Sequence, residues 1–193
     1  LRGILPLMKH RLKQRRARLE QQLLHLQVVS RISPRGHQMK LNRVAKTEAF
    51  VDVLDSVPFA QLAYFLSEPS TLYPNFSIWY NFTFRRNFSV GQRKVVVAHN
   101  GTDLLAAALL KIDESEHKIC TFYVHPDVRG LGLGAQVMNK ALEIFDKKSP
   151  LITVSDERIM ELSPLLKANG FKLVDRIPDL YRTGSCEHFF KLI

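Results

Sequence analysis

Three glycines at alternating positions, Gly130, Gly132 and Gly134, form the part of the chain that is best suited to bind a charged ligand. A strand-like run precedes them, and apolar residues at helical spacing follow. Glycine lets a backbone pass close to a ligand, and the unpaired N–H groups of a helix's first turn favour an anion. We therefore predict a cradle for a diphosphate at residues 129–135.

The surroundings of these glycines argue against two common phosphate loops. No Lys-Ser or Lys-Thr pair ends the segment, as it would in a loop for nucleoside triphosphates. A dinucleotide-binding domain would place the glycines after its first strand and continue with parallel strand-helix units. Here an antiparallel meander is expected before the glycines, which is typical of another fold.

The expected meander has three strands. Residues 94–98 and 104–112 are apolar runs around Asn100-Gly101, a pair that strongly predicts a hairpin. Residues 118–124 are rich in aromatic and β-branched side chains and predict the third strand. The glycines would thus follow the last strand of the meander.

Further elements are expected on both sides of this unit. A helix is predicted around 137–145, a short buried strand at 151–154, and a second helix that ends at Asn169-Gly170. That helix either kinks at Pro164 or begins anew there. The remaining expected elements are an opening strand at 40–45, helical segments at 48–54 and 58–66, and final strands at 171–174 and 188–192.

Residues 71–88 hold an unusual density of aromatic side chains, with Arg85 and Arg86 among them. This segment either lines a substrate pocket or forms core and a covering loop, since aromatic side chains bury a large area wherever they lie.

The net charge of +10 is concentrated at the start of the chain. Residues 1–38 carry nine Lys or Arg and one Glu, or +8, which leaves 19 basic and 17 acidic residues, or +2, for residues 39–193. Leucines every seven residues from Leu5 to Leu26 predict a basic amphipathic helix, followed by a linker at 30–38. We expect a helical extension at 1–38 and one globular domain at 39–193.

The extension has several interpretations. It is an arm for nucleic acid, the ribosome or an anionic surface, or a helix that packs on its own domain or on a second subunit, or a dispensable segment.

Hydropathy and the number of cysteines limit the class of protein to which this chain can belong. No apolar run approaches the roughly 20 residues of a transmembrane helix, so we expect a cytoplasmic protein with no membrane partner. Cys120 and Cys186 are the only cysteines, which is too few for a disulfide framework or for a zinc site without histidine ligands. We expect reduced thiols and no metal.

The segment Val124-x-Pro126-x-x-Arg129-Gly-x-Gly132-x-Gly134 resembles motif A of the GCN5-related N-acetyltransferases (GNAT). The order of elements over residues 39–193 is also similar to that family, including the Gly170-Phe171 pair. The resemblance does not extend to residues 1–38. It implies an α/β (α+β) fold in which helices flank a mixed, mostly antiparallel sheet with splayed central strands.

The resemblance also implies a site for acetyl-CoA as co-substrate. Backbone groups of Tyr123 and Val124 would face the pantetheine arm, which would lie between the strands at 118–124 and 151–154. The pyrophosphate would bind to the loop residues, which are Arg129, Gly130, Leu131, Gly132, Leu133, Gly134 and Ala135.

One departure from the family concerns the proton donor for the leaving thiolate. The family commonly places a Tyr four residues before the Gly-Phe pair, where this chain has Leu166. Candidates for that role are Tyr181, Tyr123 and Ser163, of which Tyr181 is our first choice.

The general base is also open. Lys118 stands where the family often has an acidic residue, and it would not serve as a base. Glu187 is our named candidate, with Glu116, His117 and His125 nearby in the expected fold. Glu187 and Asp179 could instead recognise a cationic acceptor.

We therefore predict an acetyl-CoA dependent N-acetyltransferase that acts on a primary amine, either a small molecule or a protein amino group, by direct attack in a ternary complex. The alternatives are a non-catalytic acyl-CoA-binding regulatory module, and an RNA- or ribosome-directed acetyltransferase that uses the basic arm. A homodimer is an open expectation, since dimers are common among proteins that resemble this family.

Overall fold

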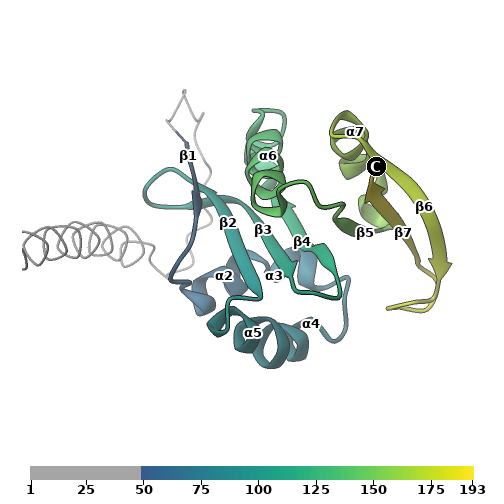
Figure 1. Ribbon diagram of the computed structural model, residues 1–193, viewed down its shortest axis with the longest axis horizontal. Helices are drawn as coiled ribbons and strands as arrows, with labels where there is room; N and C mark the ends of the chain where they lie inside the picture. Colours follow the sequence, from purple (N-terminus) through teal and green to yellow (C-terminus); the bar gives the residue numbers. More distant parts are fainter. Residues whose placement is uncertain (1–48) are drawn as a thin grey trace, which may run out of the picture. The chain divides into compact units, whose positions relative to one another are not determined.

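The computed structural model describes residues 49–193 of the chain (Figure 1). The expected extension at 1–38, the boundary that follows it and the expected strand at 40–45 lie outside the described residues.

A seven-stranded sheet with the order β1-β2-β3-β4-β5-β7-β6 forms the centre of the described part. Every neighbouring pair is antiparallel except β4 and β5, which are parallel. The predicted mixed, mostly antiparallel sheet is therefore confirmed. The strands are β1 (Phe50–Val53), β2 (Arg93–His99), β3 (Leu104–Ile112), β4 (His117–Val124), β5 (Leu151–Ser155), β6 (Phe171–Pro178) and β7 (Cys186–Leu192).

The segment expected to be helical at 48–54 is instead strand β1, so that prediction was wrong. Val51 lies opposite Ala98, and Val53 lies opposite Val96, in an antiparallel pair with β2. Both valines pack against the buried core. Pairing with an open sheet edge outweighs the helical pattern of so short a segment, and β-branched side chains favour the strand.

Two longer helices cover one face of the sheet, and several short ones cover the other (Figure 1). The first group is α6 (Leu133–Phe145) and α7 (Asp156–Ala168). The second group is α2 (Phe59–Phe65), α3 (Ser67–Ser70), α4 (Phe76–Ile78), a π-helical turn (Trp79–Phe84) and α5 (Arg85–Ser89). Alternate residues of a strand point to opposite faces, so Val96 packs under α6 while Val95 and Val97 pack against the short helices.

Helix α7 continues through Pro164 without restarting. The interpretation in which a separate helix begins at Pro164 is therefore wrong. Near the end of α7, Leu166 is fully buried in the core that α6 shares with the sheet.

Strand β4 contains an irregularity that matters for the site. Leu109 lies opposite Thr121 and Leu110 opposite Ile119, so Cys120 is an extra residue in the ladder. Because of this bulge, Ile119 and Phe122 both pack on the α6 side of the sheet.

Strands β4 and β5 are adjacent only at their beginnings. Their register consists of Lys118 opposite Leu151 and Ile119 opposite Ile152, and no pair follows in the described strands. The later residues diverge, which confirms the predicted splay of the central strands. In Figure 1, β5, β7, β6 and α7 form a group beside β4.

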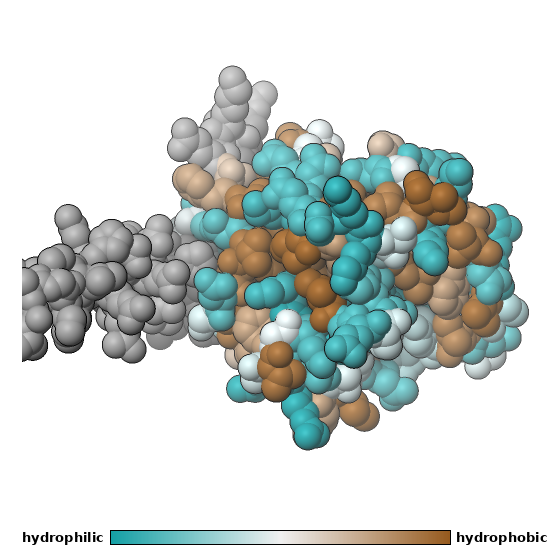
Figure 2. Space-filling view, viewed as in Figure 1, coloured by the Kyte–Doolittle hydropathy of each residue, from teal (hydrophilic) through white to brown (hydrophobic). Residues whose placement is uncertain are grey.

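The surface seen in Figure 2 is mainly hydrophilic, with apolar side chains between the polar ones. Exposed apolar residues include Met160 on α7 and Leu173 and Val174 on β6. Within residues 49–193, no helix combines the length and the apolar character that crossing a membrane requires.

Candidate active site

The glycine loop lies between β4 and α6, where the sequence predicts the diphosphate cradle. Gly130 and Gly132 have φ values of 77° and 81°, a conformation that L side chains rarely adopt. No atom lies within 4 Å of the position that a Cβ would occupy at either residue. The first turn of α6 leaves its N–H groups unpaired beside this open space. These residues therefore fit an anionic group such as a pyrophosphate.

Arg129, the first residue of the loop, is held by two oxygens. Its Nε donates to the Val124 carbonyl at 3.1 Å and lies 3.2 Å from Oε1 of Glu161 on α7. One carbonyl that was expected to face the pantetheine therefore accepts a hydrogen bond from the loop's own arginine.

Arg158 on α7 extends this chain of charges across the gap between β4 and β5. Its guanidinium lies 3.0 Å from Glu161 and 3.5 Å from Glu68 on α3. Glu68 in turn accepts a 2.7 Å hydrogen bond from the phenol of Tyr123. A series of contacts through four charged side chains and the Tyr123 phenol thus connects α7 with α3 and β4.

Tyr123 is almost fully buried beneath this chain of charges, with 2% of its surface exposed. Burial and the neighbouring Glu68 raise the pKa of its phenol well above the ordinary value. The hydroxyl is committed to Glu68, and Tyr123 lines neither of the two cavities described next.

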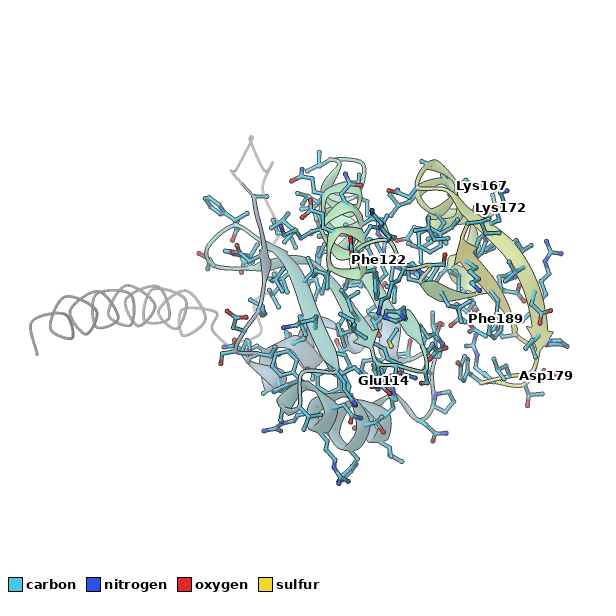
Figure 3. All side chains as sticks on the ribbon, in the orientation of Figure 1. Glu114, Phe122, Lys167, Lys172, Asp179 and Phe189 are labelled. Atoms are coloured by element: carbon cyan, nitrogen blue, oxygen red, sulfur yellow. The ribbon has the colours of Figure 1, made fainter. Side chains whose placement is uncertain are left out.

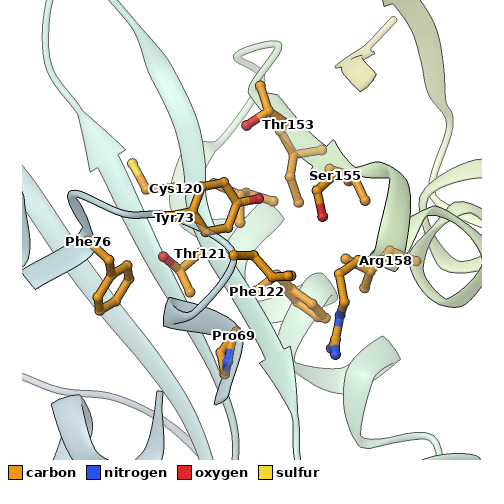
Figure 4. A pocket seen from close by; sticks show the side chains of 14 residues that line it. Pro69, Tyr73, Phe76, Cys120, Thr121, Phe122, Thr153, Ser155 and Arg158 are labelled. Carbon is orange, nitrogen blue, oxygen red and sulfur yellow. The ribbon is translucent and has the colours of Figure 1, made fainter. Parts of the chain in front are cut away.

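A small cavity of about 40 Å³ lies where β4 and β5 diverge (Figure 4). Cys120 and Thr121 of β4 line one side, and Thr153 and Ser155 of β5 line the other. This is the place where the resemblance predicts the pantetheine arm.

A larger pocket of about 410 Å³ opens on the side of the short helices. Its aromatic lining comes from the segment that was predicted to form either a pocket or core: Tyr73, Phe76 and Trp79 line the pocket, whereas Tyr80 and Phe84 are buried in the core. The pocket and the small cavity share five lining residues, which are Tyr73, Phe76, Cys120, Thr121 and Thr153. The two spaces are therefore neighbours with a common wall.

Tyr73 is the central side chain of that wall. Its hydroxyl points toward β5, where Thr153 and Ser155 lie (Figure 4). Its ring meets the ring of Tyr181 edge to face, with 5.5 Å between centroids. Burial raises the pKa of the Tyr73 phenol, and the nearby Glu187 carboxylate adds to this shift.

Glu187 lies next to Tyr73, and 4% of its surface is exposed. Burial is also the main reason why the pKa of its carboxyl is raised. Its Oε2 and the Ser155 hydroxyl are buried, and neither makes a hydrogen bond of good geometry within residues 49–193, although the Tyr73 hydroxyl is close enough to Glu187 and Ser155 for both to shift its pKa. A buried carboxylate oxygen without a partner is costly, which is typical of a group kept for function.

The backbone around Glu187 is tied to the start of α7. Asp156 accepts a 2.8 Å hydrogen bond from the Cys186 N–H, and its other oxygen lies 2.6 Å from Nε2 of His188. These bonds, that of His188 first, lower the pKa of Asp156. Both neighbours of Glu187 in β7, Cys186 and His188, are thus hydrogen-bonded to Asp156, so the backbone that carries Glu187 is held in place.

The structure brings together two of the three predicted catalytic residues. Glu187 and Tyr181 both lie beside Tyr73, whereas Tyr123 lies apart from them. Sequence reasoning did not identify Tyr73 itself. Its signal was only its place in the aromatic segment, and spacing along the chain could not show that it meets residues more than 100 positions later.

Comparison with known proteins agrees with this geometry. A sequence model of the Acetyltransferase (GNAT) family matches residues 58–156, which is half of the chain and includes the glycine loop. No curated protein matches the chain.

Solved structures of acetyltransferases share the fold. A GNAT-family acetyltransferase from Desulfovibrio desulfuricans has a TM-score of 0.60 at 12% identity, over 75% of this chain and 98% of its own. The ribosomal-protein-S18-alanine N-acetyltransferase of Escherichia coli has a TM-score of 0.58 at 14% identity, over 75% and 93%.

A third structure, a GNAT family acetyltransferase from Elizabethkingia anophelis with acetyl-CoA bound, has a TM-score of 0.53 at 11% identity, over 76% and 99% of the two chains. The predicted fold, enzyme class and acetyl-CoA co-substrate are thereby confirmed. The chain belongs to the GNAT family of acetyltransferases.

Proposed function

We propose that this acetyltransferase transfers the acetyl group of acetyl-CoA to a primary amine, which attacks the thioester directly in a ternary complex. The observation that carries the proposal is the common wall of the two cavities. The cavity between β4 and β5 and the larger pocket share Tyr73, Cys120 and Thr153, so a donor in one would lie beside an acceptor in the other. Proximity of this kind supplies much of the rate of a transfer between two substrates.

The donor would be held mainly by the glycine loop. Backbone N–H groups of Gly130 to Ala135 would bind the pyrophosphate, and the open space at Gly132 supports this role. Tyr123 and Val124 would form the β4 edge beside the pantetheine arm.

Direct attack is favoured over an acetylated enzyme, because the one thiol in the wall is a poor nucleophile. Burial raises the pKa of Cys120 to about 11, so its thiol stays protonated at neutral pH. The nitrogen of the acceptor would form the new bond to the carbonyl carbon as the C–S bond breaks.

Tyr73 is our candidate for the proton donor in place of the family's tyrosine. The bound thioester supplies the electrophile, and its thiolate must gain a proton as the amine loses one. The raised pKa of Tyr73 keeps the phenol protonated at neutral pH, so its O–H is present to hydrogen-bond to the departing sulfur, while the same shift makes the phenol a weaker acid. The proton that the amine loses would pass through water to Glu187, and Glu187 would orient the Tyr73 phenol and return that proton to it. Tyr181 would help to hold the ring of Tyr73.

Calorimetric titration with acetyl-CoA tests the donor site. Gly132→Trp would fill the cradle, and we expect its affinity to fall by at least about 100-fold, since it removes several charge-assisted hydrogen bonds at once. Gly101→Trp is the matched control, because Gly101 also has a positive φ, 89°, and open space around it, but lies in the β2–β3 turn.

Thiol release from acetyl-CoA in the presence of a panel of primary amines tests the transfer itself. Release by some amine, lost in Gly132→Trp and retained in Gly101→Trp, would support the proposal. Normal binding without release by any amine would contradict it and favour the non-catalytic module. The cytoplasmic location, the homodimer and any role of residues 1–38 stay predictions.

A further inference from the structure

The lining of the larger pocket carries a net positive charge. Three basic residues, Arg93, Lys111 and Lys118, face one carboxylate, Glu116. Lys111 lies 2.9 Å from Glu116 and 3.4 Å from Asp113, and Arg93 lies 3.5 Å from Asp113. The two carboxylates therefore offset two of the three cations, with Lys111 neutralised most directly.

Arg93 retains a donor that the protein does not satisfy. Its side chain is buried, with 6% of the residue exposed, and its Nε has no hydrogen-bond partner within residues 49–193. Nη1 reaches the Gln92 carbonyl at 2.8 Å, so only part of the guanidinium is used. A buried guanidinium N–H without a partner is costly unless a ligand provides the acceptor.

Lys118 is the third basic residue of the lining and lies two residues before the bulge in β4. It precedes the bulged residue Cys120 and is half-buried in the wall of the pocket. Its positive charge lowers the pKa of the Glu187 carboxyl, which lies next to Tyr73, and so offsets part of the rise caused by burial. Lys118 therefore lines the larger pocket and is within electrostatic reach of Glu187 at the proposed site of reaction.

Another part of the lining is aromatic. Phe76, Trp79 and Tyr181 contribute to it, and Phe76 and Trp79 pack with 5.6 Å between ring centroids. The volume of about 410 Å³ suits one small molecule rather than a folded protein surface.

We infer that the acceptor is a small amine that also carries an anionic group and an apolar body. This inference rests on the proposed function and names the substrate class of the same site. Lys118 and Arg93 bind the anionic group, the aromatic wall packs against the body, and the amine points toward Tyr73. The net reaction is N-acetylation, in which the amine gains the acetyl group and coenzyme A leaves as the thiol.

A matched pair of acceptors isolates the anionic group. Phenylalanine and phenylalaninamide differ in the carboxylate alone, and rates are expressed per concentration of unprotonated amine, because the two amines differ in pKa. We expect kcat/KM to be about 10- to 100-fold higher for phenylalanine, the range for one charge-assisted contact in a partly exposed pocket.

A variant at Lys118 tests whether the preference for the carboxylate arises in this pocket. In Lys118→Met, the ratio of the two kcat/KM values should fall toward one, and this ratio cancels any common effect on Glu187. Lys172→Met is the control and should keep the full ratio, since Lys172 is exposed on the outer strand β6 (Figure 3).

The outcomes separate the two claims. Equal rates for both acceptors in the native enzyme, or a preference that Lys118→Met leaves intact, would overturn the inference while the transferase stands. Faster acetylation of a peptide N-terminus than of either small acceptor would also overturn it. Bound acetyl-CoA with no acetylation of any amine would overturn the proposed function, and this inference with it.

Discussion

Tyr73 and Tyr181 meet edge to face in the lining of the larger pocket, with 5.5 Å between their ring centroids. One comes from the loop before α4 and the other from the β6–β7 turn, so the contact joins the two sides of the splayed sheet. The phenols have different surroundings, because Tyr73 faces β5 and Glu187 whereas Tyr181 is 44% exposed.

This difference predicts different kinetic effects for the two tyrosines. Tyr73→Phe keeps the ring contact and removes the proton donor, so kcat should fall by about 100-fold or more, the scale of general acid catalysis. Tyr181→Phe should leave kcat within a few-fold. Steady-state kinetics on both variants checks this, and equal losses in the two would contradict the assignment.

Glu187→Gln should lower activity and raise stability. Without the carboxyl that serves Tyr73, we expect kcat to fall by about 10- to 100-fold, and the limb of the pH–rate profile that reports Glu187 should disappear. Its raised pKa means that the folded state holds this proton more tightly than the unfolded state, so its contribution to stability is lost as pH rises through the folded pKa.

The melting temperature of Glu187→Gln at pH 8 should therefore exceed that of the native protein by a few degrees, roughly 2–4 °C. The gain should shrink as pH falls through the raised pKa of Glu187 and should be absent below the ordinary value of 4.5. Glu114→Gln, at an exposed turn, is the control and should change neither quantity. A less stable Glu187→Gln would mean that the carboxylate is satisfied in the fold.

Glu161→Gln should tighten the binding of acetyl-CoA. Glu161 lies 3.2 Å from Arg129 and 3.0 Å from Arg158, so it competes with an anionic ligand for both guanidinium groups. Removing its charge should lower Kd by about 3- to 10-fold at low ionic strength, and by less in 0.5 M salt, because salt screens exposed charges.

Calorimetry at the two salt concentrations measures this effect, with Glu143→Gln on α6 as control, since among residues 49–193 Glu143 forms an ion pair only with Lys140. Weaker binding in Glu161→Gln would show instead that Glu161 holds the loop in its binding conformation.

Restoring the family's tyrosine at position 166 should not restore its role. Leu166 is fully buried in the core, so the larger side chain should destabilise the protein by about 1–3 kcal/mol through overpacking. Leu166→Met, of similar volume, should cost less than about 1.5 kcal/mol. Urea unfolding measures both. A folded Leu166→Tyr with a higher kcat would show that the phenol reaches the site.

The sequence predicted the elements whose signals are local. The Asn100-Gly101 turn fixed the β2–β3 hairpin, and the glycines after β4 located the start of α6. Strand β1 could not be predicted, because Phe50–Val53 becomes a strand only through its pairing with β2.

The candidate site was predictable to a smaller extent. The glycine loop is contiguous in sequence, so its role in binding a pyrophosphate could be predicted from its spacing together with the strand and the helix expected on either side. Tyr73, Glu187 and Ser155 come from three separate elements, and their meeting depends on the crossover that places β7 beside β5. Lys118 could not be assigned from the sequence for the same reason. A lysine at this position would not serve as a general base, and its proposed role in binding an anion depends on the pocket that it lines.

The short register between β4 and β5 divides the sheet into two plates. Lys118 and Ile119 of β4, paired with Leu151 and Ile152 of β5, form the seam between a four-stranded plate and a three-stranded one, whereas β3 remains paired with β4 along the strand. Amide protons along this seam should exchange with solvent faster than those at the centre of either plate, since few backbone bonds must open. Buried residues of both plates, such as Phe122 of β4 and Ile152 of β5, belong to one core on the α6 side of the sheet. Any rotation about the seam that widens the space between the plates must therefore also repack this shared core.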